Sequence, residues 1–294
     1  MKNCLIASVL ISALGGISLP LMAKEIELPS INVVDRFEGG ASSIPGAVDI
    51  VSPEKMEMIQ PASLQDALKM VPGVNARDEE GYGAIPNIGI RGLSPNRSTK
   101  VLILEDGAPI QPSLFLSNAS YYSPPVERIS SIEVLKGATG LRYGPNTIGG
   151  VINYQSKTPL KDGIVKGKIG SHGYQLLELE AGTSSEKNGM GGGINVITSE
   201  ANGFRNNGYR MNDILVKGGV AIGQSQWLGL KLTHYQNEIN TSYVGLRPDE
   251  FIHTPTKNPA PDDQFLSSRT SFDINHELEI NTGTKLKTLL YWAN

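Results

Sequence analysis

Cysteine is almost absent from this sequence of 294 residues. The one cysteine, Cys4, lies in an N-terminal segment that has the features of a secretory signal: a positive charge at Lys2, an apolar stretch and a plausible cleavage site after Ala23. We therefore expect residues 1–23 to be a signal peptide. The mature chain would contain no cysteine, which excludes disulfide bonds and thiolate chemistry.

Long apolar runs and an excess of basic charge are missing as well. After the N-terminal segment no stretch of about 18 apolar residues occurs, so the sequence predicts no transmembrane helix. The formal net charge of −3 gives no basic footprint, and nucleic acid is therefore not an expected partner. The low charged fraction of 19% and the mean hydropathy of −0.16 fit a soluble protein or the strands of an outer-membrane protein.

Catalytic motifs are also missing. The sequence contains no Gly-x-Ser-x-Gly elbow, no His-Glu-x-x-His pair and no phosphate-binding loop, so we predict no enzyme, no catalytic residue and no bound cofactor. The four histidines stand alone and predict no metal site. The acidic runs 78–80 and 261–263 are interpreted as solvated loops, which would repel an anionic chelate.

The residues that follow the predicted signal peptide divide into three parts, 24–44, 45–160 and 163 onward. Residues 24–44 are interrupted by glycine and proline and are predicted to be flexible. The short apolar run 31–34 within them is either an edge strand or a peptide that adds a strand to the sheet of a partner. Residues 45–160 mix helical and strand patterns, which predicts a compact α+β domain.

Local signals support this domain. Ser52 followed by Pro53 predicts the start of a helix. Apolar residues recur at helical spacing over 64–71 until a Pro-Gly pair ends the pattern. Asp106-Gly107 lies between apolar flanks and predicts a tight turn.

From residue 163 onward the pattern alternates between apolar and polar residues, which predicts about seven antiparallel strands. In 266–280, apolar residues such as Phe272 and Ile274 point one way, and charged residues such as Asp273 point the other. The connections alternate between short turns and long polar loops, as in outer-membrane barrels. A soluble antiparallel sheet is the alternative. An odd set of about seven strands is not expected to close, so we expect the N-terminal part of a longer protein.

Several stretches resemble a known family. "LQDALKMVPGV", "IGIRGLSPNRS", "VLILEDGAPI" and "VERISSIEVLKGATGLRYGPNTIGGVINYQSKTP" are similar in order and spacing to the N-terminal portion of TonB-dependent outer-membrane transporters, most of all the ferric-citrate type. The resemblance implies a plug domain over residues 45–160 and, over 163–294, the first strands of a transmembrane β-barrel of about 22 strands. It places the protein in the outer membrane of a Gram-negative bacterium, in contact with lipid, with the plug facing the periplasm.

The resemblance also implies roles for individual residues. A TonB box, the contact for TonB and its inner-membrane motor complex, is assigned to Ile31, Asn32, Val33, Val34 and Asp35. Arg91 and Arg142 match plug arginines that pair with barrel-wall glutamates in the family. Those glutamates would lie beyond residue 294, and arginines that merely face water are the alternative. Arg128 is expected to pair with a carboxylate of the plug.

The implied activity is TonB-dependent uptake of an iron chelate, ferric citrate or a siderophore, bound between plug loops and wall loops. Hydroxyl and amide side chains of the loop 111–122 would hydrogen-bond it, and two arginines would attract an anion. The candidate substrate residues are Arg77, Arg97, Gln111, Ser113, Asn118, Tyr121 and Tyr122. Heme or vitamin uptake is the alternative within transport, and a passive porin or adhesin is the alternative outside it.

Overall fold

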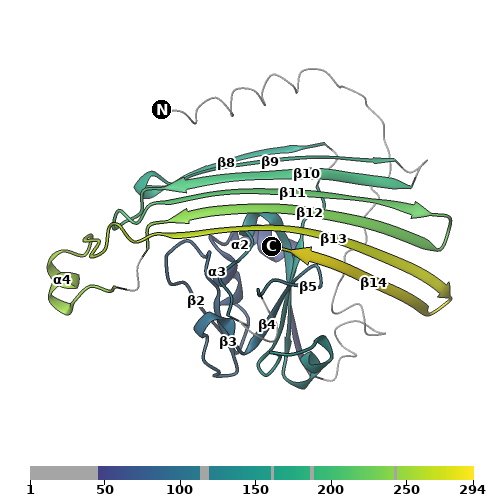
Figure 1. Cartoon of the computed structure of the whole chain (residues 1–294), viewed down its shortest axis with the longest axis horizontal. Coiled ribbons are helices and arrows are strands. Elements are labelled where there is room, and N and C mark those ends of the chain that lie inside the picture. Colours follow the sequence, from purple (N-terminus) through teal and green to yellow (C-terminus); the bar gives the residue numbers. More distant parts are fainter. Residues whose placement is uncertain (1–45, 113–118, 160–161, 186–188, 242–243) are drawn as a thin grey trace, which may run out of the picture.

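The protein has two layers, a small α+β domain and a long sheet that lies along one side of it (Figure 1). The computed structural model describes residues 46–112, 119–159, 162–185, 189–241 and 244–294. The predicted signal peptide and TonB box lie outside these residues. No helix within the described ranges is long and apolar enough to cross a membrane.

The α+β domain, called the plug below, is built on a five-stranded sheet in the order β1-β6-β7-β4-β5. β4 and β7 are parallel, and the other neighbours are antiparallel. A separate pair joins β2 to β3. The strands are β1 (Ala47–Val51), β2 (Val74–Arg77), β3 (Asn87–Ile90), β4 (Val101–Glu105), β5 (Ala108–Pro109), β6 (Ile129–Lys136) and β7 (Gly150–Ser156).

Two short helices cover the plug sheet, α2 (Pro53–Ile59) and α3 (Leu64–Leu68). The predicted start of α2 is confirmed, because Ser52 is the N-cap and its hydroxyl accepts a hydrogen bond from the amide of Lys55 at 3.4 Å. α3 ends earlier than its apolar spacing predicts, because before Pro72 the chain tightens into 3-10 hydrogen bonds, in which the amides of Met70 and Val71 donate to the carbonyls of Ala67 and Leu68.

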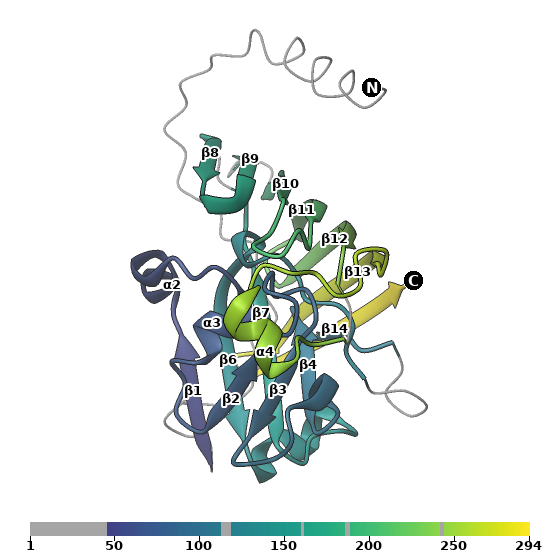
Figure 2. The same ribbon diagram turned by 90° about the vertical axis from the view of Figure 1, so that its left-hand side faces the viewer.

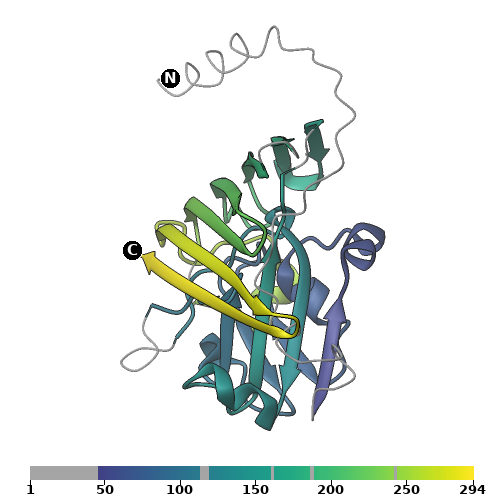
Figure 3. The same cartoon turned by 90° about the vertical axis from the view of Figure 1, so that its right-hand side faces the viewer.

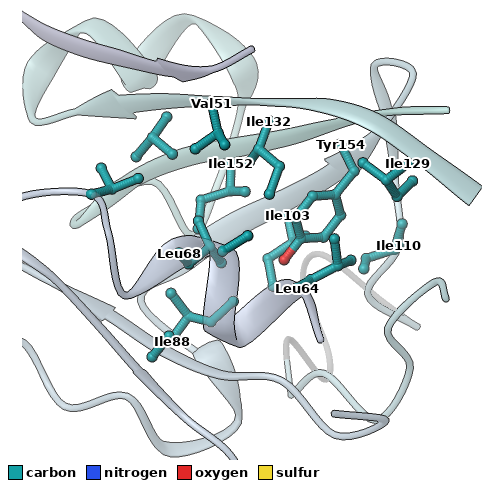
Figure 4. Packing of buried hydrophobic residues seen from close by; sticks show 14 of the residues in the cluster. Val51, Leu64, Leu68, Ile88, Ile103, Ile110, Ile129, Ile132, Ile152 and Tyr154 are labelled. Atoms are coloured by element: carbon teal, nitrogen blue, oxygen red, sulfur yellow. The ribbon is translucent and has the colours of Figure 1, made fainter. Parts of the chain in front are cut away.

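The plug core lies between α3 and the sheet. Leu64 and Leu68 of α3 contact the apolar faces of the central strands, represented by Ile103, Ile132 and Ile152, as Figure 4 shows. Each of these side chains is almost fully buried. Their removal from water is the main stabilising contribution to the plug. Short 3-10 turns complete the plug, namely η4 (Asn96–Ser98), η5 (Val126–Arg128) and η6 (Ala138–Tyr143).

The long sheet, called the wall below, contains seven antiparallel strands in chain order from β8 to β14. Figures 2 and 3 view it from its two ends and show the plug on one side of it. The predicted number of strands and their alternation are confirmed. The strands are β8 (Ile164–Ile169), β9 (Gln175–Ser185), β10 (Met190–Ala201), β11 (Tyr209–Ile222), β12 (Gln226–Ile239), β13 (Phe265–Asn281) and β14 (Thr284–Ala293).

The two faces of the wall differ in chemistry. Charged side chains, among them Asp213, Lys231 and Asp273, point toward the plug and are buried. On the opposite face the strand register aligns an exposed apolar row across five strands. This row consists of Ile194, Val216, Leu232, Phe272 and Trp292. A polar inner face with an apolar outer face is the arrangement of a wall that meets lipid.

The connections between wall strands also match the predicted alternation. One end of the sheet carries the 3-10 turn η7 (Ser171–Gly173), the loop 202–208 and the long connection 240–264, which contains α4 (Pro248–His253). The turn 223–225, at the opposite end, is short. We refer to the first end as the long-loop end (Figure 1).

Candidate functional site

The β4–β5 hairpin turn joins the plug to the wall. Asp106 and Gly107 have positive φ angles of 48° and 83°, the backbone of a tight hairpin turn for which Asp-Gly is suited. The turn therefore projects the Asp106 carboxylate toward the wall, where it accepts a hydrogen bond from Lys231 Nζ at 2.9 Å. The same ammonium lies 2.8 Å from a carboxylate oxygen of Asp273, so it bridges the plug and a neighbouring wall strand.

Arg128, next to this turn, is fully buried between the plug and the wall. Its Nη1 donates to Asp213 of β11 at 2.6 Å, and its Nη2 donates to Glu105 of β4 at 2.8 Å. Nη2 also donates to the Tyr122 hydroxyl at 2.5 Å. We call Glu105, Asp106, Arg128, Asp213, Lys231 and Asp273 the ion network.

Within the ion network, neighbouring opposite charges outweigh the effect of burial on Glu105 and Arg128. Burial disfavours ionisation of Glu105, but the positive charges of Arg128 and Lys231 outweigh it and hold the pKa of Glu105 below its usual value. Burial likewise opposes the charge of Arg128, and the two carboxylates reverse that effect and raise its pKa. Both Glu105 and Arg128 are therefore expected to be charged at neutral pH. Removing one partner would leave a buried charge uncompensated.

Two further ion pairs join the plug to the first wall strands. Lys157, just after β7, lies 2.9 Å from Glu178 of β9. Glu127 lies 3.0 Å from Lys168 of β8. Together with the ion network, these contacts connect the plug directly to four wall strands, β8, β9, β11 and β12, and through Lys231 to Asp273 of β13.

A cleft of about 790 Å³ opens between the plug and the wall at the long-loop end. On the plug side it is lined by the loop 78–84, and on the wall side by residues of η7, the loop 202–208 and the connection 240–264. Tyr82 of the plug stacks on Tyr209 of the wall, with ring centroids 4.4 Å apart and an interplanar angle of 10°. The Tyr82 hydroxyl donates to the backbone carbonyl of Asn207 at 3.0 Å. We call this space the aromatic cleft.

Glu80 is the most unusual acid in the aromatic cleft. It is 4% exposed, and its Oε1 accepts hydrogen bonds from the backbone amides of Ala84 and Ile85. Its Oε2 is buried, and it has no hydrogen-bond partner within the described part of the chain. Burial, reinforced by the nearby charge of Asp78, raises the pKa of Glu80 to about 7. At neutral pH the group is therefore close to half protonated.

Comparison with known proteins assigns the family. Residues 40–151 match the model of the TonB-dependent Receptor Plug Domain. The chain belongs to the TonB-dependent receptors. Its seven-stranded wall is accordingly the start of the transmembrane β-barrel that follows the plug in this family.

Curated relatives of this receptor are vitamin B12 transporters. BtuB of Vibrio vulnificus (strain YJ016) is 30% identical over 236 residues, which are 80% of this chain and 37% of that protein. BtuB of Photobacterium profundum is 26% identical over an alignment of 321 positions, which covers 100% of this chain and 51% of that protein. The chain thus spans about a third to a half of the length of these relatives.

Solved structures of iron transporters share the fold. The ferric citrate transporter FecA in the unliganded form superposes with a TM-score of 0.77 at 22% identity, covering 88% of this chain and 41% of that one. The ferric-catecholate import receptor Fiu from E. coli K12 gives a TM-score of 0.67 at 18% identity, covering 92% of this chain and 42% of that one. At such identities the likeness concerns the fold alone.

The predicted substrate residues of the receptor fall into different environments. Arg97 is 8% exposed and forms an ion pair with Glu79, so its charge is already compensated inside the plug, and its role as a substrate contact stays a prediction. Gln111 is also buried, and its amide bonds to the backbone of Val101 and Ile103 in β4, which is a structural role. Arg77, at the end of β2, is exposed.

The predicted tyrosines differ from each other. Tyr122 is buried in the ion network, and Arg269 of the wall lies 5.1 Å from its ring centroid. Tyr121 is 41% exposed and lies between Arg97 and Phe265 of the wall, so it remains a candidate ligand contact. Ser113 and Asn118 lie outside the described residues.

The arginines of the predicted plug–barrel lock both lie at the plug surface. Arg91 is exposed and packs over Gly137, where a Cβ would come within 2.5 Å of its Nη1. Gly137 also has a positive φ of 86°, and this backbone conformation is what favours glycine there. Arg142 is exposed and lies 5.9 Å from the ring centroid of Tyr143. Their pairing with wall glutamates stays a prediction, because the expected partners lie beyond residue 294.

The sequence reasoning correctly gave Arg128 a plug carboxylate, Glu105, but missed its wall partner and the rest of the ion network. A signal was present in the strand pattern, because Asp213, Lys231 and Asp273 occupy the inward positions of alternating strands. Charged side chains that are buried in those positions need oppositely charged partners on the domain that packs against the sheet.

Proposed function

We propose that the receptor takes up an iron chelate across the outer membrane, with energy delivered by TonB and its inner-membrane motor complex through residues 31–35. The chelate binds on the extracellular side at the long-loop end, and the plug with its TonB box faces the periplasm. The apolar outer row from Ile194 to Trp292 supports contact with outer-membrane lipid.

The plug itself is the observation that carries this proposal. A globular domain covers the inner face of the wall and is held there by buried ion pairs such as Arg128–Asp213 at 2.6 Å. A passive pore needs no such obstruction, whereas a transporter that admits ligand only when energised does. The porin and adhesin alternatives are accordingly disfavoured.

Backbone and side-chain changes in the TonB box test the proposal. If Ile31–Val34 adds as a strand to a sheet of TonB, then Val33→Pro, which removes an N–H and fixes φ, should abolish uptake. Val33→Ala retains the backbone and is the matched control, with mild loss expected. Both variants, expressed from the complete gene, should still bind ligand at the cell surface. Normal uptake by Val33→Pro would contradict the proposal.

Vitamin uptake remains a second candidate. The matched relatives named vitamin B12 transporters favour it, and so does the small number of cationic side chains in the aromatic cleft.

A further inference from the structure

We propose that the plug loop 78–84, called the Glu80 loop below, is a pH-sensitive switch. The loop is docked on the wall while the carboxyl group of Glu80 is protonated, and it leaves the wall when that group ionises. The inference concerns regulation and goes beyond the proposed function, because it holds for whichever ligand the receptor carries.

The Glu80 loop is joined to the wall by aromatic packing and neutral hydrogen bonds. Tyr82 stacks on Tyr209, and its hydroxyl donates to the carbonyl of Asn207. In return, the side-chain amide of Asn207 donates to the backbone carbonyl of Glu80 at 3.4 Å. Among the described residues no ion pair links this loop to the wall, since Glu79 forms its ion pair inside the plug. Release of the loop therefore leaves the ion network intact.

The side chain of Glu80 closes the loop on itself. Its Oε1 accepts hydrogen bonds from the amides of Ala84 and Ile85, so one carboxyl group connects the start of the loop to its end. The neutral amide of Gln65, in α3, supports the same turn by donating to the carbonyl of Ile85 at 3.3 Å. If the carboxyl group turns out toward water, both bonds to Glu80 are lost. The loop then loses the conformation that presents Tyr82 to the wall.

The surroundings of Glu80 favour the neutral carboxyl group. Its Oε2 is buried and has no hydrogen-bond partner in the described ranges. Asp78 of the same loop adds a like charge, so burial first and Asp78 second raise the pKa of Glu80 to about 7. On the wall side Tyr209 and Tyr235 line the same space, and their phenol groups are uncharged at neutral pH.

The other charged groups around the aromatic cleft are engaged elsewhere. Glu127 pairs with Lys168 at 3.0 Å. Arg205 donates its Nε–H to a backbone carbonyl on the wall side at 3.0 Å. His172 of η7 also lines the cleft, and histidine is a residue type that titrates near neutral pH. It is therefore the group against which the role of Glu80 has to be controlled.

The sign of the pH effect follows from the change in the environment of Glu80. In the docked loop its pKa is about 7, and in a released, hydrated loop it returns to the ordinary value of 4.5. Docking is therefore strongest below pH 4.5, weakens above it, and has lost its full contribution once the pH has risen through 7. Between pH 5 and pH 8 this linkage makes the docking equilibrium constant about 70-fold smaller.

Hydrogen exchange in the purified receptor, expressed from its complete gene, tests the inference. Exchange rates measured from pH 5 to pH 8 are divided by the intrinsic rate at each pH, so that only the change in protection remains. When exchange proceeds through release of the loop, residues 80–85 and the wall loop 203–208 should lose protection together, by about 70-fold, and level off above pH 7. The amide of Gln60, which bonds to the Met56 carbonyl in α2, is the internal reference and should not change.

Three variants assign the effect to one group. Glu80→Gln keeps the Oε1 acceptor but cannot ionise, so the protection of both segments should change little between pH 5 and pH 8. Asp78→Asn retains an acceptor for the amides of Gly81 and Gly83 and removes the like charge, so less protection should be lost. His172→Gln is the matched control and should keep the native pH dependence.

Equal protection of the native receptor at pH 5 and pH 8 would overturn the inference, and so would an undiminished pH dependence in Glu80→Gln. Loss of the pH dependence in His172→Gln would also overturn it, because the switch would then belong to the histidine. Should Glu80→Gln fail to fold, a pH dependence in Asp78→Asn as large as the native one would decide against the inference. The measurement involves no uptake, so its outcome is independent of whether TonB drives transport.

Discussion

Replacing Arg128 by methionine should loosen the plug more than any other single change in the ion network. Arg128 has no exposed surface and contacts two carboxylates, at 2.6 Å and 2.8 Å, as well as the Tyr122 hydroxyl. Methionine fills much of the volume but leaves Asp213 buried without the guanidinium and Glu105 with Lys231 alone, at 3.5 Å. Breaking a buried ion pair in this way costs about 3–5 kcal/mol.

Hydrogen exchange in the plug measures this cost. The amides of Asp106 and Ser156 bond inside the plug next to the ion network, to the Tyr154 carbonyl and to the Asp106 carboxylate. If exchange proceeds through release of this region from the wall, a loss of about 3–5 kcal/mol corresponds to exchange about 150- to 5,000-fold faster. The native receptor in the same detergent is the reference.

Two comparisons make the result specific. Arg210→Met removes an exposed arginine whose pair with Glu200 is 3.7 Å long, with both side chains more than half exposed, and it should cost less than about 1 kcal/mol. Adding Glu105→Gln and Asp213→Asn to Arg128→Met removes the orphaned charges and should restore part of the protection. If Arg128→Met exchanges like Arg210→Met, the ion network does not hold the plug.

Two further predictions concern the plug. Burial raises the pKa of Glu80 from 4.5 to about 7, so folding favours the protonated carboxyl group. This contribution to the free energy of unfolding is complete below pH 4.5. It is lost as the pH rises through 7, and the total loss is about 3 kcal/mol. Glu80→Gln keeps the Oε1 acceptor without the charge. Thermal unfolding should therefore show it stabilised relative to the native receptor at pH 8 and not at pH 5, and an equal effect at both pH values would contradict the assignment. If Arg91 and Arg142 pair with wall glutamates, replacing either by alanine should accelerate exchange over residues 137–150 and reduce uptake; unchanged exchange and uptake in both variants would favour arginines that face water.

Local features of the fold were predictable because they depend on neighbouring residues. Ser52 and Pro53 determine a helix start, and Asp106-Gly107 determines a hairpin turn, through backbone preferences that operate within a few residues. The alternation of 266–280 determines which face of β13 is apolar, and the structure confirms it. The end of α3 was less predictable, because Val71 can be buried whether the chain continues as an α-helix or tightens into a 3-10 turn.

The ion network could not be assigned from such signals. Arg128 and Asp213 are 85 residues apart, and Asp106 and Lys231 are 125 residues apart, so their pairing depends on how the plug docks on the wall. The same limit applies to Arg97. The sequence alone could not show that the loop 78–80 places Glu79 beside it as an ion-pair partner. Charge type and strand position are encoded locally, but the identity of the partner is not.

Uptake of the bound ligand by cells with and without TonB tests the central claim most directly. Cells that express the complete gene would be given a radiolabelled iron chelate that binds the receptor, and accumulation inside the outer membrane would be followed over time. Energised uptake predicts accumulation above the external concentration in cells that contain TonB, and surface binding alone in cells that lack it. Equal accumulation in both strains would contradict the claim.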